Sequence, residues 1–157
     1  MKKVDKRRRI ENKTNYHKRL ILLKGNSARL VVRKSNKYIL LQIVESSHAL
    51  DKVVLQANTK ELLKYGWPED KQGSLKSLSA AYLVGCLMSK KAKDLNGRVI
   101  LDSGLIPNTK GSRVYAAVKG VADSGLNIKF DEKILPDMEK IEEVEFFNKV
   151  KEKINNG

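Results

Sequence analysis

Residues 77–97 read SLSAAYLVGCLMSKKAKDLNG and hold the strongest helical pattern in the chain. Ser77 has the character of an N-cap, and Gly97 is the expected stop after a cluster of lysines near the C-terminal end. Apolar or small residues recur at intervals of three and four, which places them on one continuous helix face: Leu78, Ala81, Gly85, Met88, Ala92 and Leu95. The pattern predicts a central helix whose apolar face packs on another layer of structure.

Upstream of this helix, strand-like runs alternate with turns. Residues 29–34 and 38–46 are rich in Val, Ile and Leu, and the Ser-Asn-Lys at 35–37 has turn composition, which predicts a β-hairpin. A third run, 53–57, can extend that sheet. A short helix is expected over 59–65, because the Gly-Trp-Pro that follows disfavours further helix.

Downstream, the pattern predicts a short buried strand over 98–102, a loop over 103–111, a helix over 112–124 and a last short strand over 127–130. Beyond residue 130 the composition turns acidic, and apolar spacing predicts a terminal amphipathic helix through Ile141, Val144, Phe147 and Val150. We therefore expect a mixed α/β sandwich built on a three-stranded meander with one or two crossover strands. It occupies 14–130, between a basic arm over 1–13 and an acidic tail over 131–157.

Charge is concentrated at one end of the chain. The 157 residues include 32 Lys+Arg and 18 Asp+Glu, for a net charge of +14, but residues 1–37 alone hold 14 Lys+Arg and two acids. The arm has too few apolar residues to bury, so we expect it to be mobile until it is bound. Concentrated positive charge attracts a polyanion, which makes nucleic acid the leading partner and an anionic membrane surface the second. Residues 15–24 are too short for a convincing membrane-binding helix, and no apolar run is long enough to span one.

Signals for catalysis are weak. The chain has no phosphate-binding glycine loop, and one cysteine with two histidines cannot build a usual zinc site, so we expect no cofactor and no small-molecule substrate. Asp102-Ser103-Gly104 follows a buried strand, as an active-site edge would. A metal-dependent RNA-cleaving enzyme is the alternative function, and it would need converging carboxylates, for which the available residues are Asp51, Asp94, Asp102 and Asp123. None of these has a paired spacing.

Basic side chains recur in several structural contexts, with aromatic rings among them. A short helix is expected from a cap at Thr14 or Asn15 to a stop at Gly25. Its Tyr16 ring can stack on an unpaired base, and His17 is expected to contact solvent or phosphate. The other contexts are the arm, the hairpin tip and the loop before the 112–124 helix. A dispersed set of this kind suits a folded RNA of irregular shape.

Short strings along the chain resemble, in order, the archaeal branch of the family of large-subunit ribosomal protein eighteen. They lie at residues 7–9, 14–20, 29–37, 65–67, 79–85, 101–105, 111–116 and 123–126, so the resemblance covers about residues 7–138. It implies a ribonuclease H-like topology without catalytic carboxylates. It also implies a non-enzymatic protein of the cytoplasmic large ribosomal subunit, which binds 5S rRNA and attaches it to the large rRNA in the central protuberance beside neighbouring ribosomal proteins.

The resemblance also implies which residues contact RNA, by position. They lie in the arm and first helix, in the hairpin tip and in the loop before the 112–124 helix: Arg7, Arg8, Arg9, Lys13, Tyr16, Arg19, Arg33, Lys34, Ser35, Asn36, Lys37, Asn108, Thr109, Lys110, Gly111, Ser112 and Arg113. The tail after residue 138 lies outside the match. We expect it to pack either on the domain or on a neighbouring ribosomal protein.

Overall fold

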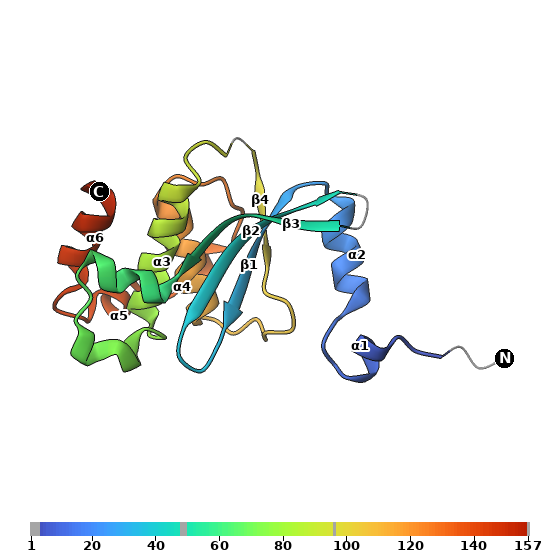
Figure 1. Ribbon diagram of the computed structural model, residues 1–157, viewed down its shortest axis with the longest axis horizontal. Helices are drawn as coiled ribbons and strands as arrows, with labels where there is room; N and C mark the ends of the chain where they lie inside the picture. Colours follow the sequence, from blue (N-terminus) through green and yellow to red (C-terminus); the bar gives the residue numbers. More distant parts are fainter. Residues whose placement is uncertain (1–3, 48–49, 96, 157) are drawn as a thin grey trace.

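A four-stranded mixed sheet organises the computed structural model, which describes residues 4–47, 50–95 and 97–156 (Figure 1). The strands follow the order β3-β2-β1-β4, with antiparallel pairing except between β1 and β4, which are parallel. Their bounds are β1 (Ala28–Lys34), β2 (Ile39–Ser47), β3 (Leu50–Asn58) and β4 (Val99–Asp102). The predicted hairpin and third strand are confirmed. The predicted strand over 127–130 is wrong, because only one parallel bridge, Val99 to Ile128, forms there.

The sheet has two outer strands, β3 and β4. Most of β3 is exposed, and three of its apolar side chains face solvent: Leu50 (77% exposed), Val53 (47%) and Val54 (40%). Alternation along β1 places Leu30 and Val32 in the apolar core and puts Arg29 on the other face of the sheet.

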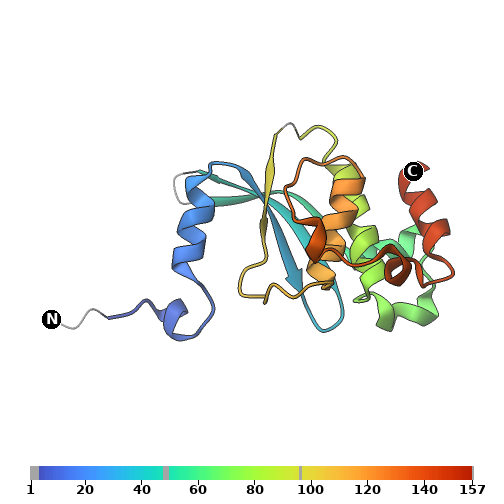
Figure 2. The ribbon, with the colours of Figure 1, turned by 180° about the vertical axis from the view of Figure 1, so that it is seen from behind.

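Two helices cover the core face of the sheet: α3 (Leu78–Lys91) and α4 (Arg113–Asp123) (Figures 1 and 2). The Ser77 side chain accepts a hydrogen bond from the Ala80 N–H, so the predicted N-cap is confirmed. The expected stop at Gly97 is wrong, since the helix ends at Lys91. A single apolar face was also too narrow a prediction, because every residue from Ser79 to Ser89 is buried. The sheet, α4 and the C-terminal helices surround α3.

Two glycines allow α3 and α4 to touch backbone to backbone. A Cβ on Gly85 would fall onto the Ala117 carbonyl oxygen and within 2.9 Å of the Val121 nitrogen. A Cβ on Gly120 would likewise meet the Tyr82 carbonyl group of α3. Neither collision can be relieved by a side-chain rotation, so any larger residue must push the helices apart.

The acidic tail packs on the domain. It forms α5 (Met138–Glu142) and α6 (Phe147–Asn156), not the single helix expected, and both contact α3. The apolar side chains of Ile141, Phe147, Val150 and Ile154 are fully or almost fully buried. Between the two helices, the Phe146 ring stands edge-on to Trp67, with centroids 4.7 Å apart. Packing on the domain is thus one role that the tail fulfils.

Short helices complete the chain. The 3₁₀ helix η1 (Thr59–Tyr65) is the predicted helix after β3; η2 (Glu69–Ser74) and η3 (Glu132–Ile134) are also 3₁₀ turns. At the N-terminal end, α1 (Arg7–Ile10) and α2 (Tyr16–Lys24) contain no buried residue, and they extend away from the end of the molecule that carries α6 (Figures 1 and 2). Asn15 caps α2 and Gly25 ends it, as predicted. No helix among the described residues has the length and apolar character to cross a membrane.

We predict that Gly120→Ala lowers the free energy of unfolding by about 1–3 kcal/mol, because the added methyl group overpacks the α3–α4 contact. Urea unfolding followed by circular dichroism measures the change. Gly73→Ala is the matched control, since a Cβ there meets nothing within 4 Å. Equal stability of the two variants would contradict the close-contact interpretation.

Candidate nucleic-acid interface

A groove of about 500 Å³ lies where the arm, α2, the end of β1 and the segment after β4 meet. Side chains from three of the predicted RNA-binding regions thus meet at one place, and six of the lining residues are cations against one carboxylate, Asp102. The cations are Arg8, Lys13, Lys18, Arg19, Arg33 and Lys34. A groove lined by one sign of charge concentrates the field that attracts an oppositely charged ligand.

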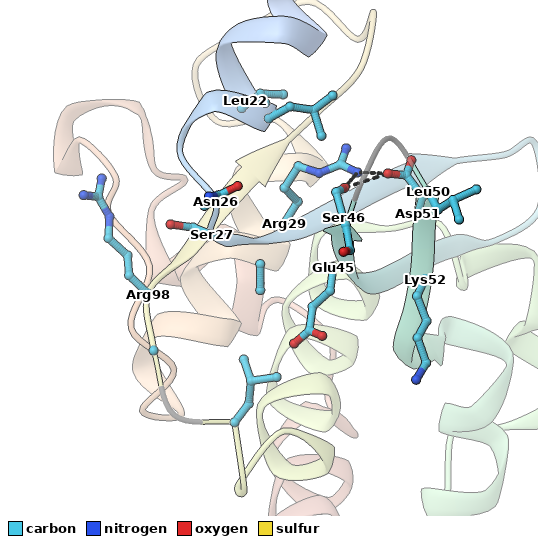
Figure 3. Close-up of a pocket in the computed structure, with 15 residues that line it drawn as sticks. Leu22, Asn26, Ser27, Arg29, Glu45, Ser46, Leu50, Asp51, Lys52 and Arg98 are labelled. Carbon is cyan, nitrogen blue, oxygen red and sulfur yellow. Dashed lines mark hydrogen bonds and ion pairs between the residues drawn. The ribbon is translucent and has the colours of Figure 1, made fainter.

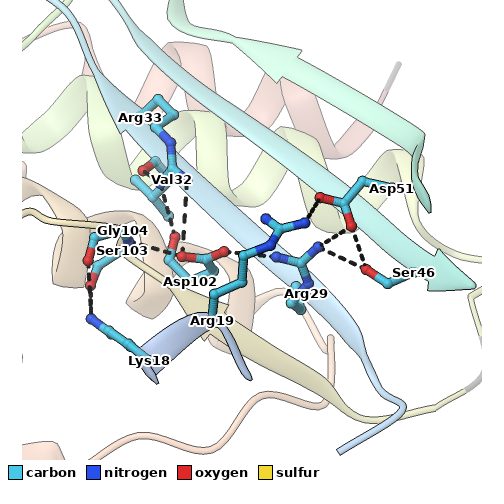
Figure 4. A network of polar contacts seen from close by, with 10 residues as sticks. All are labelled: Lys18, Arg19, Arg29, Val32, Arg33, Ser46, Asp51, Asp102, Ser103 and Gly104. Carbon is cyan, nitrogen blue, oxygen red and sulfur yellow. Dashed lines mark hydrogen bonds and ion pairs between the residues drawn. The ribbon is translucent and has the colours of Figure 1, made fainter. Parts of the chain in front are cut away.

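Hydrogen bonds to the backbone and to hydroxyl groups hold several of these cations in place. The Lys18 ammonium donates to the Ser103 hydroxyl and to the Gly104 carbonyl, at 3.2 Å each (Figure 4). The Arg8 Nε donates to the Thr14 hydroxyl at 2.9 Å. The Arg33 guanidinium donates to the Val32 carbonyl at 2.9 Å. Each of these bonds orients a cation without adding a negative charge, although Arg33 also lies 3.9 Å from the Asp102 carboxylate.

Gly104 makes room for Arg33. Its φ is +62°, and a Cβ there would lie 3.0 Å from a guanidinium nitrogen of Arg33. The Gly104 N–H donates to the Asp102 carboxylate at 2.9 Å, which closes the turn after β4. Asp102-Ser103-Gly104 is therefore a tight turn that supports one wall of the groove.

Beside the groove, a buried arginine joins four segments of the chain. Arg29 is 2% exposed, and its guanidinium donates to Asp102 at 2.9 Å, to Asp51 at 2.8 Å and to the Ser46 hydroxyl at 2.8 Å (Figure 4). Asp51 also accepts from Arg19 of α2 at 2.7 Å. The network thus ties α2 to the sheet, and it couples one groove cation to a carboxylate.

These contacts determine the ionisation of Asp51. Burial alone would raise the pKa of its carboxyl group, but hydrogen bonds from Ser46 and Arg19 and the positive charges of Arg29 and Arg19 outweigh that effect. The pKa of Asp51 is about 2, below its ordinary value of 3.8. Asp51 is therefore ionised at neutral pH and balances Arg29.

The remaining predicted residues of the arm and α2 lie near the groove. Tyr16 and His17 line an adjoining hollow of about 340 Å³ together with Arg9. The Lys6 ammonium lies 4.6 Å from the centre of the Tyr16 ring, and Arg7 makes an exposed ion pair with Glu11 at 3.7 Å. The two hollows share Thr14, Asn15 and the exposed apolar Leu105, so they form one continuous surface.

The hairpin tip and the 108–113 loop lie along the lower edge of the molecule in Figure 1, the edge on which α1 also lies (Figures 1 and 2). Of the tip, Arg33 and Lys34 line the groove; Asn36 and Lys37 are exposed, and the Ser35 hydroxyl closes the turn through bonds with Tyr38. The loop does not line the groove. Asn108, Thr109 and Lys110 are exposed, Arg113 begins α4, and the Gly111 N–H donates to the Ile134 carbonyl at 3.0 Å. The Ser112 hydroxyl is buried, with no hydrogen-bond partner among the described residues.

Most of the carboxylates that were considered as metal ligands make other contacts in the structure. Asp102 and Asp51 both bind Arg29, and Asp123 accepts a hydrogen bond from the Tyr82 hydroxyl at 2.9 Å on a different part of the molecule. Asp94 is exposed. Within the described ranges, no three Asp, Glu, His or Cys residues are grouped to hold a metal ion.

A second hollow, of about 710 Å³, opens between α2, the ends of the strands and the segment before β4 (Figure 3). Arg29, Lys52 and Arg98 line it against Glu45 and Asp51, so its charges nearly balance. The Arg29 Nε has no hydrogen-bond partner among the described residues. This hollow is larger than the groove, but its charge makes it the weaker candidate for a polyanion.

The sequence did not reveal that Arg29 pairs with Asp51, which was considered only as a candidate metal ligand. The only signal is a charged residue at the start of the run 29–34 and another just before the run 53–57, and such charges also occur at ordinary exposed strand ends. Their pairing depends on the β2–β3 register, which brings Asp51 opposite Ser46.

Comparisons with a family model and with individual known proteins relate this chain to one family. The profile of the family described as ribosomal large subunit proteins 60S L5 and 50S L18 matches residues 2–97 and 93–131. Large ribosomal subunit protein uL18 of Korarchaeum cryptofilum is 49% identical over 140 residues, which is 88% of this chain and 70% of the relative. The proteins of the same name from Methanoculleus marisnigri and Ignicoccus hospitalis are each 43% identical, over 86% and 88% of this chain and 75% and 67% of the relative.

We predict that Asp102→Asn lowers the free energy of unfolding by about 2–3 kcal/mol, because it leaves the buried Arg29 charge with only one carboxylate. Chemical denaturation at neutral pH tests this. Asp94→Asn, on the surface, should change stability by no more than about 0.5 kcal/mol. A stability loss no larger at Asp102 than at Asp94 would show that the network contributes little.

The lowered pKa of Asp51 predicts an acid-sensitive contribution to stability. Since the folded-state pKa lies below the ordinary value of 3.8, the contribution is complete above about pH 4 and is lost as the pH falls through about 2. The difference in unfolding free energy between wild type and Asp51→Asn should therefore shrink from pH 5 to pH 2. A difference that stays constant over that range would refute the assignment.

Proposed function

The chain belongs to the family of ribosomal large subunit proteins 60S L5 and 50S L18, and from that membership we propose that it binds 5S rRNA and attaches it to the large rRNA in the central protuberance. As a protein of the large ribosomal subunit it acts in the cytoplasmic ribosome, where rRNA and other ribosomal proteins surround it. Its role is structural: it holds RNA and catalyses no reaction.

The observation that carries the proposal is the groove with its six cations and single carboxylate. Phosphate groups are the ligands that such a surface favours, because each phosphate bound by Lys or Arg releases condensed counterions from the RNA. The side chains come from the arm, α2 and the hairpin, so the surface is curved and irregular. Such a surface matches a folded RNA better than the groove of a regular duplex.

Different residues of the interface suit different parts of the RNA. Arg8 and Arg33 present guanidinium groups that can bind phosphate oxygens in pairs, whereas Lys13 and Lys34 act as point charges. Tyr16 offers a half-buried ring for stacking on an unpaired base. The exposed 108–110 residues and Arg113 extend the proposed contact surface beyond the groove.

We also retain the ribonuclease H-like topology as part of the proposal. Three antiparallel strands followed by a parallel fourth, β4, support it, as does the parallel bridge from Val99 to Ile128 beside that strand.

We predict that wild-type affinity for 5S rRNA falls on the order of 10³-fold between 50 and 200 mM salt, if about six phosphates are bound. Lys13→Gln/Lys34→Gln should weaken binding and make the plot of log affinity against log salt shallower by about two. Filter binding with labelled 5S rRNA measures both quantities. Lys60→Gln/Lys64→Gln, on η1, removes the same charge elsewhere and should leave the slope unchanged. A salt-independent affinity would overturn the phosphate-binding role of the groove.

A further inference from the structure

A third hollow, of about 480 Å³, lies among α3, α4 and α6. Its rim carries four lysines, Lys90, Lys93, Lys119 and Lys151, and one carboxylate, Asp123. Lys90 and Lys93 belong to the lysine cluster at and just after the C-terminal end of α3, and the packing of the helices brings Lys119 and Lys151 beside them. Figures 1 and 2 place α6 at the end of the molecule opposite to α1, so this lysine hollow is remote from the groove.

Three of the four ammonium groups are held in position without losing their charge. Lys90 donates to the Ile154 carbonyl at 2.6 Å, and Lys119 donates to the Pro136 carbonyl at 3.1 Å. The Lys151 ammonium lies 5.3 Å from the centre of the Tyr82 ring. Carbonyl oxygens and ring faces orient a cation, but they carry no negative charge to balance it.

Few carboxylates lie close enough to the lysines of this hollow to compensate their charge. None of its four lysines forms an ion pair with a carboxylate of the described residues, whereas Lys13, Arg19 and Arg33, which line the groove, do. The one rim carboxylate, Asp123, accepts a hydrogen bond from the Tyr82 hydroxyl. Lys119 also borders a neighbouring hollow that is lined by Asp123, Glu132, Asp137 and Glu139. The excess of positive charge therefore lies on the side of the lysine hollow formed by Lys90, Lys93 and Lys151.

We propose that the lysine hollow is a second RNA-backbone site, which binds phosphates of the large rRNA while the groove holds 5S rRNA. This inference rests on the proposed function. Four lysines without an arginine fork suit phosphates bound as point charges, with no reading of base identity. Because the two surfaces lie at opposite ends of the molecule, the protein can join two RNA segments without either one displacing the other.

The test uses the full chain with 5S and large-subunit rRNA transcribed from Korarchaeum cryptofilum sequences. Affinity for labelled large rRNA is measured over a salt series in the presence of saturating unlabelled 5S rRNA, which occupies the groove. For Lys93→Gln/Lys151→Gln we expect the salt slope for large rRNA to become shallower by about two, and the affinity at low salt to fall about tenfold. Binding to labelled 5S rRNA alone should stay within about twofold of wild type.

The control is Lys60→Gln/Lys64→Gln, which removes two exposed lysines of η1. Unchanged large-rRNA binding by the Lys93/Lys151 variant overturns the proposal, and so does an equal loss in the control or an equal loss of 5S binding. If the wild type fails to bind 5S rRNA, the proposed function fails, and the large-rRNA measurement still decides the role of the hollow. If the double variant unfolds at a lower temperature than the wild type, Lys93→Gln alone is used instead. The Lys93 side chain makes no hydrogen bond or ion pair with the described residues, and its replacement should lower the salt slope by about one.

Discussion

The guanidinium of Arg29 is almost completely removed from water on the face of the sheet away from α3 and α4. A buried charge of this kind is unfavourable unless carboxylates and hydrogen bonds compensate it, and here Asp51 and Asp102 provide that compensation from two other strands. Asp51 in turn binds Arg19 of α2. The position of α2, which has no buried residue of its own, therefore depends on electrostatic contacts more than on apolar packing. The interface residues on α2 are placed by the same contacts.

Different interactions stabilise the structure on the two faces of the sheet. On one face, Gly85 and Gly120 let α3 and α4 meet at backbone distance, and a continuous apolar core results. On the other, polar contacts orient cations around the turn after β4. The face that packs on α3 and α4 contributes the apolar core, and the opposite face carries the exposed cations.

Local patterns predicted much of this architecture. The hairpin, the third strand, the Ser77 cap and the Asn15 cap all depend on neighbouring residues, and the structure contains each of them. The end of α3 and the strand over 127–130 were predicted wrongly, because tertiary contacts decide both. In the candidate site, the cations were visible as a cluster of charge, but the Arg29 network was not, since it joins residues 73 and 22 positions apart. Lys90 and Lys93 were visible as part of a lysine cluster, but their grouping with Lys119 and Lys151 was not, because it depends on tertiary packing.

The outer strand β3 affects how the free protein behaves before it is incorporated into the ribosome. Its outer edge is unpaired among the described strands, and Leu50, Val53 and Val54 are exposed along it, interrupted only by the charges of Asp51 and Lys52. Edge strands with free backbone groups and exposed apolar side chains are templates for pairing with other chains and for aggregation. The newly made protein therefore carries a self-association hazard on the strand that supplies Asp51. Rapid incorporation into a larger particle would limit the time for which that hazard lasts.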